Sequence, residues 1–230
     1  MSEQRLPNHV AIIMDGNRRW AAQRHKPAIF GHRAGIRAVR RTMDAANQIG
    51  IKVITIYAFS TENWTRPKRE VNQLMALFEW TLDHEFAELE GRGVRFMASG
   101  RLDGIPERLH DKLLQATART ADNQQGVLNM AFNYGGRAEI VDAVRAIVAD
   151  GVRADSVDEN LIASHLYTTG LPDPDLIIRT AGEVRLSNFL LWQSAYSELH
   201  FTETLWPDFT AADLSSAVDA YASRQRRFGR

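Results

Sequence analysis

An acidic residue, a turn and two arginines follow directly on an apolar stretch near the N-terminus. In HVAIIMDGNRRWA, residues 9–21, the apolar run is followed by Asp15, Gly16, Asn17, Arg18 and Arg19. A short, continuous apolar run is typical of a strand that is buried on both faces of a parallel sheet. Glycine and asparagine favour a turn, so a plain connector is one interpretation. The other is a site for Mg²⁺ and phosphate, because a carboxylate, backbone N–H groups and guanidinium groups at a strand end supply what both ligands require.

A second polar stretch, YAFSTENWTRP at residues 57–67, also follows an apolar run. It supplies Ser60, Thr61, Glu62, Asn63 and Arg66. Serine, threonine and asparagine also cap helices and form turns, so capping and ligand binding have equal support for this stretch taken alone.

A third polar stretch, RTAGEVRLSN at residues 179–188, contains Arg179, Arg185 and Ser187. Two guanidinium groups and a hydroxyl can hold a diphosphate, because guanidinium offers forked donors to phosphate oxygens and stays charged. A solvated loop is the alternative. Glu198, in AYSELHF, stands between aromatic and apolar residues, a setting more typical of a paired residue at a sheet edge than of a metal ligand.

Composition narrows the class of protein. The chain of 230 residues can bury one sizeable core and contains no linker or repeat, so we expect a single domain over residues 1–230. Lys and Arg together number 28, as do Asp and Glu, which gives no electrostatic case for nucleic acid. There are no cysteines, which excludes disulfides and thiolate chemistry. Without an apolar signal segment or a membrane-length apolar run, we expect a cytoplasmic protein, at most peripheral to a membrane.

Apolar runs and helical periodicity alternate along the chain. The runs that predict strands are 10–14, 53–59, 94–98, 127–132 and 176–178. The patterns that predict helices are 33–49, 72–90, a segment that begins at Pro106, and 140–148. Ser156 with Glu159, and Thr210 with Asp213, predict capping boxes of two more helices. This alternation indicates an α/β fold with a mostly parallel sheet flanked by helices, whose ligands gather at the strand ends.

Common catalytic signatures are absent. The sequence has neither G-x-G-x-x-G nor G-x-x-x-x-G-K-[ST], no H-E-x-x-H, and no G-x-S-x-G around Ser194. The run IIMDGN superficially resembles an aspartyl-phosphate phosphohydrolase. The second aspartate of such a site, two residues away, is missing, since position 13 is Ile and position 17 is Asn.

The ordered motifs together resemble one family, the cis-prenyltransferases, and within it the bacterial undecaprenyl diphosphate synthases. The resemblance covers nearly the whole chain, through HVAIIMDGN-RRWA, FGHRAG, YAFSTENWTRP, NYGGR, IIRTAGEVRLSNFLLWQSAYSELHF, LWPDF and RQRRFG. The D-D-x-x-D motif of trans-prenyl synthases is absent, in keeping with this assignment. The resemblance implies the fold of that family, with an apolar tunnel for the growing product.

The resemblance implies that isopentenyl diphosphate extends an allylic diphosphate, expected to be farnesyl diphosphate, with Mg²⁺ as cofactor. Asp15 and Asn63 are the implied catalytic residues, and Asp15 and Glu198 the implied metal ligands. The implied substrate-binding residues are Gly16, Asn17, Arg18, Arg19, Trp20, His32, Ser60, Thr61, Glu62, Trp64, Arg66, Arg179, Arg185 and Ser187. Of these, Arg179, Arg185 and Ser187 are expected to hold isopentenyl diphosphate.

The family resemblance also implies a homodimer, in which the C-terminal segment at about 222–230, with Arg227 and Gly229, contacts the partner subunit. Four positions depart from the usual family pattern: Arg18 replaces a Gly, Ala28 an Arg, Ala181 a Gly or Ser, and Val184 a His. Ala58 matches a tunnel position that is bulkier in short-chain members. We therefore expect a medium-chain product, undecaprenyl diphosphate; a short-chain or irregular synthase and a noncatalytic subunit are the alternatives.

Overall fold

The computed structural model describes residues 6–224. Within them, one sheet of six parallel strands has the order β3-β4-β2-β1-β5-β6. The strands are β1 (His9–Ile13), β2 (Val53–Ser60), β3 (Val94–Ser99), β4 (Gly126–Tyr134), β5 (Leu176–Arg179) and β6 (Glu198–Phe201). Because β1 lies between β2 and β5, the polar stretches that follow these three strands meet at one edge of the sheet.

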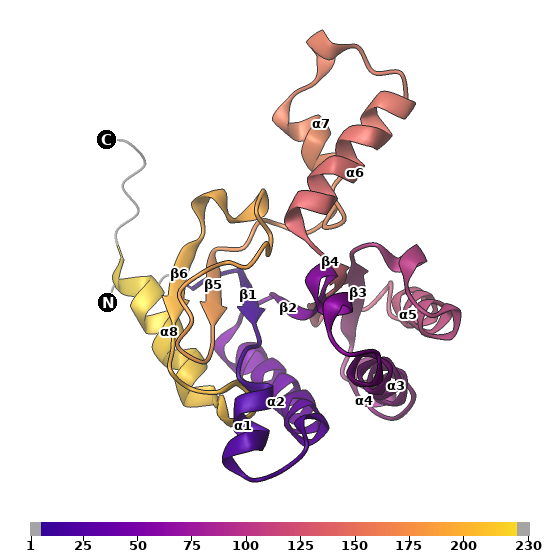
Figure 1. The fold of residues 1–230 in the computed structure, drawn as a ribbon. Coiled ribbons are helices and arrows are strands. Elements are labelled where there is room, and N and C mark those ends of the chain that lie inside the picture. Colours follow the sequence, from indigo (N-terminus) through magenta and orange to yellow (C-terminus); the bar gives the residue numbers. More distant parts are fainter. Residues whose placement is uncertain (1–5, 225–230) are drawn as a thin grey trace.

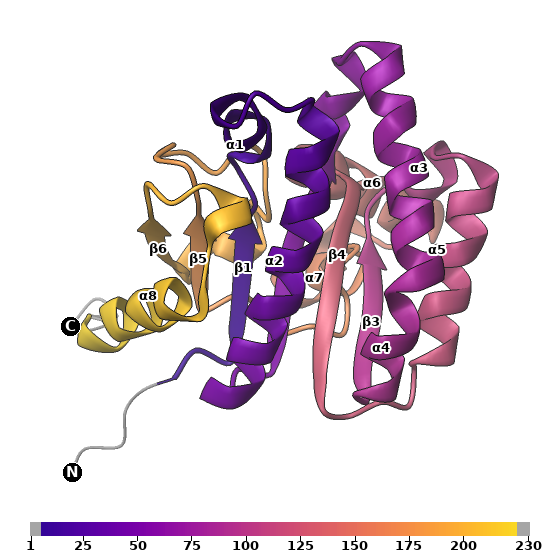
Figure 2. The ribbon, with the colours of Figure 1, turned by 90° about the horizontal axis from the view of Figure 1, so that it is seen from below.

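Helices cover both faces of the sheet (Figures 1 and 2). The longer helices are α2 (Ala28–Ile49), α3 (Lys68–His84), α5 (Glu107–Arg119), α6 (Gly136–Ala149) and α8 (Ala211–Ser223), and the shorter ones are α1 (Asn17–Gln23), α4 (Phe86–Gly91) and α7 (Glu159–Ser164). Short 3₁₀ helices are η1 (Thr61–Thr65), η2 (Leu102–Gly104), η3 (Ala154–Ser156), η4 (Gln193–Tyr196) and η5 (Trp206–Asp208). Helices α6 and α7 lie on one face, and α2, α3, α5 and α8 on the other.

The core lies on both sides of the central strand β1, all of whose residues are buried. Val10 and Ile12 pack into the large apolar cluster beneath α2, α3 and α8, whereas Ala11 and Ile13 pack into a smaller cluster on the other face. This two-residue period inside an unbroken apolar run is what burial of both faces of a strand requires.

The five predicted strands are all present as β1 to β5. The sixth, β6, was not predicted, because its four residues are only partly buried and their sequence, ELHF, is not an apolar run. It pairs with β5 alone, at the edge of the sheet.

The predicted helices are present with corrected ends. Helix α2 begins at Ala28 rather than at residue 33, and the predicted helix 72–90 is divided at Glu85 into α3 and α4. The Ser156–Glu159 capping box is wrong: Asp158 caps α7 by accepting a hydrogen bond from the N–H of Leu161. The box of Thr210 and Asp213 at the start of α8 is confirmed.

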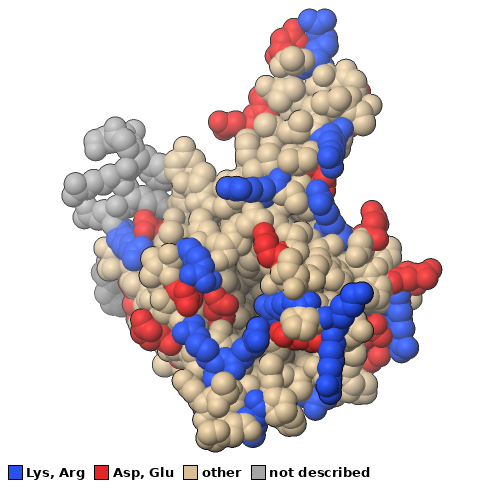
Figure 3. Space-filling model, viewed as in Figure 1, with Lys and Arg blue, Asp and Glu red and all other residues tan. Residues whose placement is uncertain are grey.

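Charges of both signs are spread over the surface. Figure 3 shows Lys and Arg interspersed with Asp and Glu on the face seen in Figure 1, as equal numbers of the two kinds would suggest. Among the described residues, none of the helices combines the length and the apolar character needed to cross a bilayer.

Candidate active site

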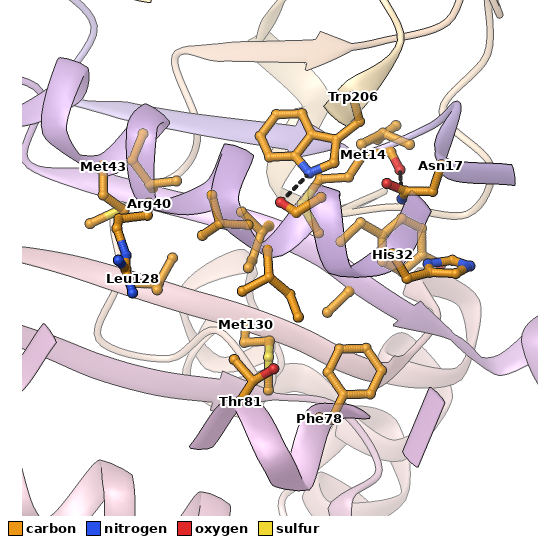
Figure 4. A pocket seen from close by; sticks show the side chains of 18 of the residues that line it. Met14, Asn17, His32, Arg40, Met43, Phe78, Thr81, Leu128, Met130 and Trp206 are labelled. Atoms are coloured by element: carbon orange, nitrogen blue, oxygen red, sulfur yellow. Dashed lines mark hydrogen bonds between the residues drawn. The ribbon is translucent and has the colours of Figure 1, made fainter. Parts of the chain in front are cut away.

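A cavity of about 1230 Å³ opens at the carboxyl ends of β1, β2 and β5 and runs between the sheet and the helices α2 and α3. Figure 4 shows Asn17 and His32 toward one end of this cavity and Arg40 and Met43 toward the other. The mouth is polar. Thirteen of the residues named from the sequence line the cavity: Asp15, Gly16, Asn17, Arg18, Arg19, His32, Ser60, Glu62, Asn63, Arg66, Arg179, Arg185 and Ser187.

Asp15 is held in place from the neighbouring strand β5. The guanidinium of Arg179 donates to Asp15 Oδ2 from Nε at 3.0 Å and from Nη2 at 2.6 Å. Arg179 is 3% exposed, whereas the Asp15 side chain is 41% exposed. No described residue donates a hydrogen bond to Asp15 Oδ1, so this oxygen can bind a ligand in the cavity.

The backbone behind Asp15 depends on glycine at two positions. Gly16 precedes α1 with φ 106°, a left-handed conformation that glycine adopts without strain. Gly31 on α2 lies against this turn, and a Cβ there would stand 1.9 Å from the carbonyl oxygen of Asn17. Helix α2 can therefore pack directly on the turn, which brings His32 to the mouth of the cavity.

Three further cations and one neutral imidazole surround this end of the cavity. Arg18 and Arg66 both approach Glu70, at 3.9 and 3.3 Å, and Arg19 lies 3.8 Å from Glu183. Burial, with the nearby guanidinium groups of Arg66 and Arg18, lowers the pKa of His32 to about 4. The imidazole is therefore neutral at pH 7.

The His32 ring has an unused polar atom. Its Nε2 is buried and has no hydrogen-bond partner among the residues that the structure describes. A buried polar atom without a partner is costly in a folded protein, so an atom of this kind beside several cations is well explained by a ligand.

The segment after β2 has a structural role as well as a place in the cavity. The Asn63 side chain accepts a hydrogen bond from the Ser60 N–H at 3.2 Å and closes a capping box at the start of η1. The capping interpretation is therefore confirmed, and Ser60 and Asn63 also line the cavity, where ligand binding stays a prediction.

The loop after β5 is held in an unusual backbone conformation. Ala181, Ser187, Asn188 and Leu190 all have positive φ, between 46° and 73°. Such conformations persist only where the surroundings enforce them. Arg179 contributes through Nη1, which donates to Ser187 Oγ at 2.7 Å and to the carbonyl of Arg185. The Arg185 side chain itself is 59% exposed and pairs with Glu183.

Asn188 is a cavity residue that sequence reasoning missed. Its Nδ2 donates to Glu62 Oε1 at 2.9 Å, its Oδ1 accepts from the Arg137 N–H at 2.9 Å, and its carbonyl accepts from the Gly136 N–H at 2.7 Å. One side chain thus joins the segment after β2, the start of α6 and the loop after β5. Its position directly after Ser187, a predicted substrate-binding residue, was the signal in the sequence that could have identified it.

Three predicted substrate-binding residues do not line the cavity: Trp20, Thr61 and Trp64. The Trp20 indole donates to Asp208, and the Trp64 indole donates to Asn133 at 2.7 Å and packs edge-on against Phe59. In this structure the two indoles hold α1 and η1, which lie beside cavity residues, against the rest of the fold.

The strand register separates Asp15 from Glu198 within one chain, and a metal site that combines the two residues stays a prediction. Glu198 is the first residue of β6 and is paired in register with Leu176 of β5. Leu176 is in turn paired with Val10 of β1. Asp15 lies five residues after Val10 along the chain, two residues beyond the end of β1. Glu198 instead pairs with Arg224 at 2.7 Å. The described residues contain no group of three or more histidine or acidic side chains that could hold a metal ion.

Beyond the mouth, the cavity wall becomes apolar. Its middle is lined by Ile36, Val39, Met43, Ile54, Ile56, Ala58, Leu74, Leu77, Phe78, Leu82, Leu128 and Met130. Ala58 stands at an irregularity of β2, where Tyr57 pairs with Ala131 and Phe59 with Phe132, so Ala58 has no partner on β4. Such a bulge redirects a side chain, and Ala58 lines the cavity.

The fold and the cavity define a parallel α/β protein with a cationic mouth and an apolar interior, and comparisons identify its family. A family model described as "Putative undecaprenyl diphosphate synthase" matches residues 13–229. The chain is 49% identical to an isoprenyl transferase of Heliobacterium mobile, over all of this chain and 91% of that protein. The chain belongs to the undecaprenyl diphosphate synthase family of cis-prenyltransferases.

Two further relatives carry more specific names. One is the ditrans,polycis-undecaprenyl-diphosphate synthase ((2E,6E)-farnesyl-diphosphate specific) of Xanthomonas axonopodis pv. citri, with 49% identity over 97% of this chain and 89% of that protein. The other is a solved structure, the lavandulyl diphosphate synthase from Lavandula x intermedia in complex with dimethylallyl diphosphate. It superposes with a TM-score of 0.93 at 42% identity and covers 98% of this chain and 99% of that chain.

Proposed function

We propose that this enzyme condenses isopentenyl diphosphate repeatedly with farnesyl diphosphate and forms undecaprenyl diphosphate, the lipid carrier of cell-wall synthesis. The observation that carries the proposal is the continuity of one cavity, which joins a cationic mouth to an apolar interior. Diphosphates require the cationic mouth, and a growing hydrocarbon tail requires the apolar interior. The name of the Xanthomonas relative supports the choice of primer and product.

The mouth offers two groups of phosphate ligands. Arg18, Arg19 and Arg66, with the turn at Gly16 and Asn17, are the proposed ligands of the allylic diphosphate. Arg185 and Ser187, held by Arg179, are the proposed ligands of isopentenyl diphosphate. Arg179 already uses Nε, Nη1 and Nη2 on Asp15, Arg185 and Ser187, so it acts chiefly by fixing the other groups.

The residues at the mouth fit Mg²⁺ bound jointly by protein and substrate. Mg²⁺ is commonly held by one or two carboxylates together with substrate phosphates. Asp15 supplies one carboxylate oxygen that accepts no hydrogen bond from residues 6–224, and Arg179 fixes the orientation of its side chain. The bound ion would neutralise charge on the diphosphate that leaves.

The condensation forms one carbon–carbon bond. The terminal alkene carbon of isopentenyl diphosphate joins C1 of the allylic chain, the allylic C–O bond breaks, and diphosphate leaves with its electron pair. A proton is then lost from the isopentenyl unit to give the new cis double bond. The proposed roles of this chain are orientation of the two diphosphates by the cations and support of condensation and proton loss by Asn63 and Arg66.

A short-chain or irregular synthase is the second candidate, because the lavandulyl diphosphate synthase superposes so closely. The cavity favours the longer product. It continues past Ala58 to Phe86 and Leu89 of α4, and a chain that ended after one or two additions would leave much of this apolar wall unused.

Incubation of the enzyme with Mg²⁺, labelled isopentenyl diphosphate and either farnesyl or dimethylallyl diphosphate, followed by chromatography of the products, tests the proposal. We expect farnesyl diphosphate to be extended to C55. Termination at C15 or below, with excess isopentenyl diphosphate, would favour the second candidate. A protein inactive with both primers would favour a noncatalytic subunit.

A homodimer in the cytoplasm, with at most peripheral membrane contact through its lipid product, completes the proposal. Helix α6 carries an exposed apolar stripe of Val141, Val144 and Val148, which are 46%, 47% and 70% exposed. Burial of this stripe against a second copy would remove it from water. Sedimentation of the Val144→Asp/Val148→Asp variant checks this, with a monomer as the expected result. Arg227 and Gly229, predicted to reach the partner subunit, lie outside the described residues.

A further inference from the structure

Charges on α2 and α4 border the part of the cavity that is far from Asp15, which Asn47, Lys52 and Gln125 also line. Helix α3 ends at His84, and the chain turns at Glu85 into α4. The turn allows Phe86 to be buried with its ring edge-on to Phe96 on β3, at 6.0 Å between ring centroids. It also places the polar residues of the α3–α4 junction beside α2.

Five charged side chains, two on α2 and three in residues 85–92, form a connected network, which we call the ionic ring: Arg40, Asp44, Glu85, Glu88 and Arg92. Arg40 pairs with Glu85 and, at 2.8 Å, with Glu88. Arg92 pairs with Glu88 and with Asp44. Glu88 therefore joins the two arginines, and the ring links α2 to the segment that follows α3.

All five ring residues line the cavity. Arg40 and Asp44 follow His32 on α2 by eight and twelve residues, or about 12 and 18 Å at the rise of a helix. Figure 4 shows Arg40 and His32 toward opposite ends. The wall between the mouth and the ring is apolar and includes Val39, Met43 and Leu82.

The five side chains are between 28% and 44% exposed, so water still reaches their charges. A hydrocarbon tail that advanced into the ring would remove this water and provide no hydrogen bonds in exchange. Desolvation of charged groups opposes such a step, whereas each earlier isoprene unit along Val39 and Met43 meets an apolar wall.

We propose that the ionic ring sets the length of the product, as the point at which further growth of the tail becomes unfavourable. This inference rests on the proposed function, since it requires the tail to grow through the cavity. It assigns Arg40, Asp44, Glu85, Glu88 and Arg92 a role in specificity that is separate from binding of either diphosphate.

The test removes one charge of each sign and extends the apolar wall. Arg40→Leu/Glu88→Leu is compared with the wild type for the lengths of its products at saturating isopentenyl diphosphate. We expect the longest product to gain at least one isoprene unit. Arg92→Leu/Asp44→Leu changes the other side of the ring and gives the same expectation, should the first variant fail to fold by circular dichroism.

The matched control is Lys112→Leu/Asp83→Leu. This ion pair also involves the C-terminal end of α3, but neither residue lines the cavity, so product lengths should not change. The inference is overturned if both ring variants make products of wild-type length, if they make shorter products, or if the control shows an equal shift. None of these outcomes would affect the proposed function. A wild-type enzyme that performs no repeated elongation would overturn the proposed function and this inference with it.

Discussion

Arg179 donates two hydrogen bonds to a single oxygen of Asp15, from Nε at 3.0 Å and from Nη2 at 2.6 Å. The two residues are 164 positions apart in sequence; Arg179 is the last residue of β5, and Asp15 follows the neighbouring parallel strand β1. One side of the carboxylate is occupied by the protein and the other faces the cavity. A buried arginine thereby positions the acid and, through Nη1, also the loop that carries Ser187.

Asp15→Ala is expected to reduce kcat by roughly 10²–10³-fold, since loss of one preorganised electrostatic group costs about 3 kcal/mol in a transition state. Asp15→Asn is the matched variant, because it retains the shape and an acceptor for Arg179. Steady-state kinetics with Mg²⁺ measure the effect, and circular dichroism checks the fold. Wild-type kcat in both variants would remove Asp15 from the proposed machinery.

Arg185→Ala is expected to raise KM for isopentenyl diphosphate more than KM for the allylic primer. Its side chain is exposed at the loop after β5, whereas Arg19 lies on α1. Arg179 is less suitable for this test, because its removal would also release Asp15 and Ser187. An equal rise in both KM values after Arg185→Ala would contradict two separate phosphate sites.

Asn188→Asp is expected to lower kcat, because it places a second carboxylate against Glu62 in place of the amide donor. Asn188→Asp/Glu62→Gln restores a donor–acceptor pair with its polarity reversed and should recover part of the loss. A coupling of about 1 kcal/mol in the double-mutant cycle is typical of residues in contact. If the double variant is no more active than Asn188→Asp, the contact does not position the segment after β2.

Ala58→Leu is expected to shorten the products, because it adds branched volume to a packed cavity wall. Ala98→Leu makes the same change at a half-buried position of β3 that does not line the cavity. Chromatography of products made from farnesyl diphosphate measures the distribution. An unchanged distribution in Ala58→Leu would show that the tail does not pass this position.

The free energy of unfolding is expected to fall as the pH decreases from 6.5 to about 4. Burial lowers the pKa of His9 to about 4, so in this range the unfolded chain binds a proton that the folded chain does not. The loss approaches about 1.4 kcal/mol per pH unit for one such group. Denaturant unfolding of His9→Gln should show a shallower decrease than the wild type; an identical slope would exclude His9 as a contributor.

Local sequence patterns determined much of the fold. The apolar runs identified β1 to β5, because a buried strand must be apolar on both faces, and Thr210 with Asp213 identified the start of α8. The polar residues after β1, β2 and β5 could be expected to meet, since parallel strands end at one edge of a sheet.

Other features depended on contacts between distant segments. The turn at Glu85 follows from burial of Phe86 against β3, and the short edge strand β6 forms only because β5 offers it a partner. Asn188 lines the cavity and contacts Glu62, a residue 126 positions away in the sequence.

Glu198 shows most clearly what sequence alone could not decide. The family resemblance placed it with Asp15, but the strand register places it level with Val10, five residues before Asp15. Periodicity reports which faces of an element are buried, and it therefore determined the elements of this protein and the polar ends that could bind phosphate. The order and register of the strands decide which side chains meet, and these arise only when the whole chain packs.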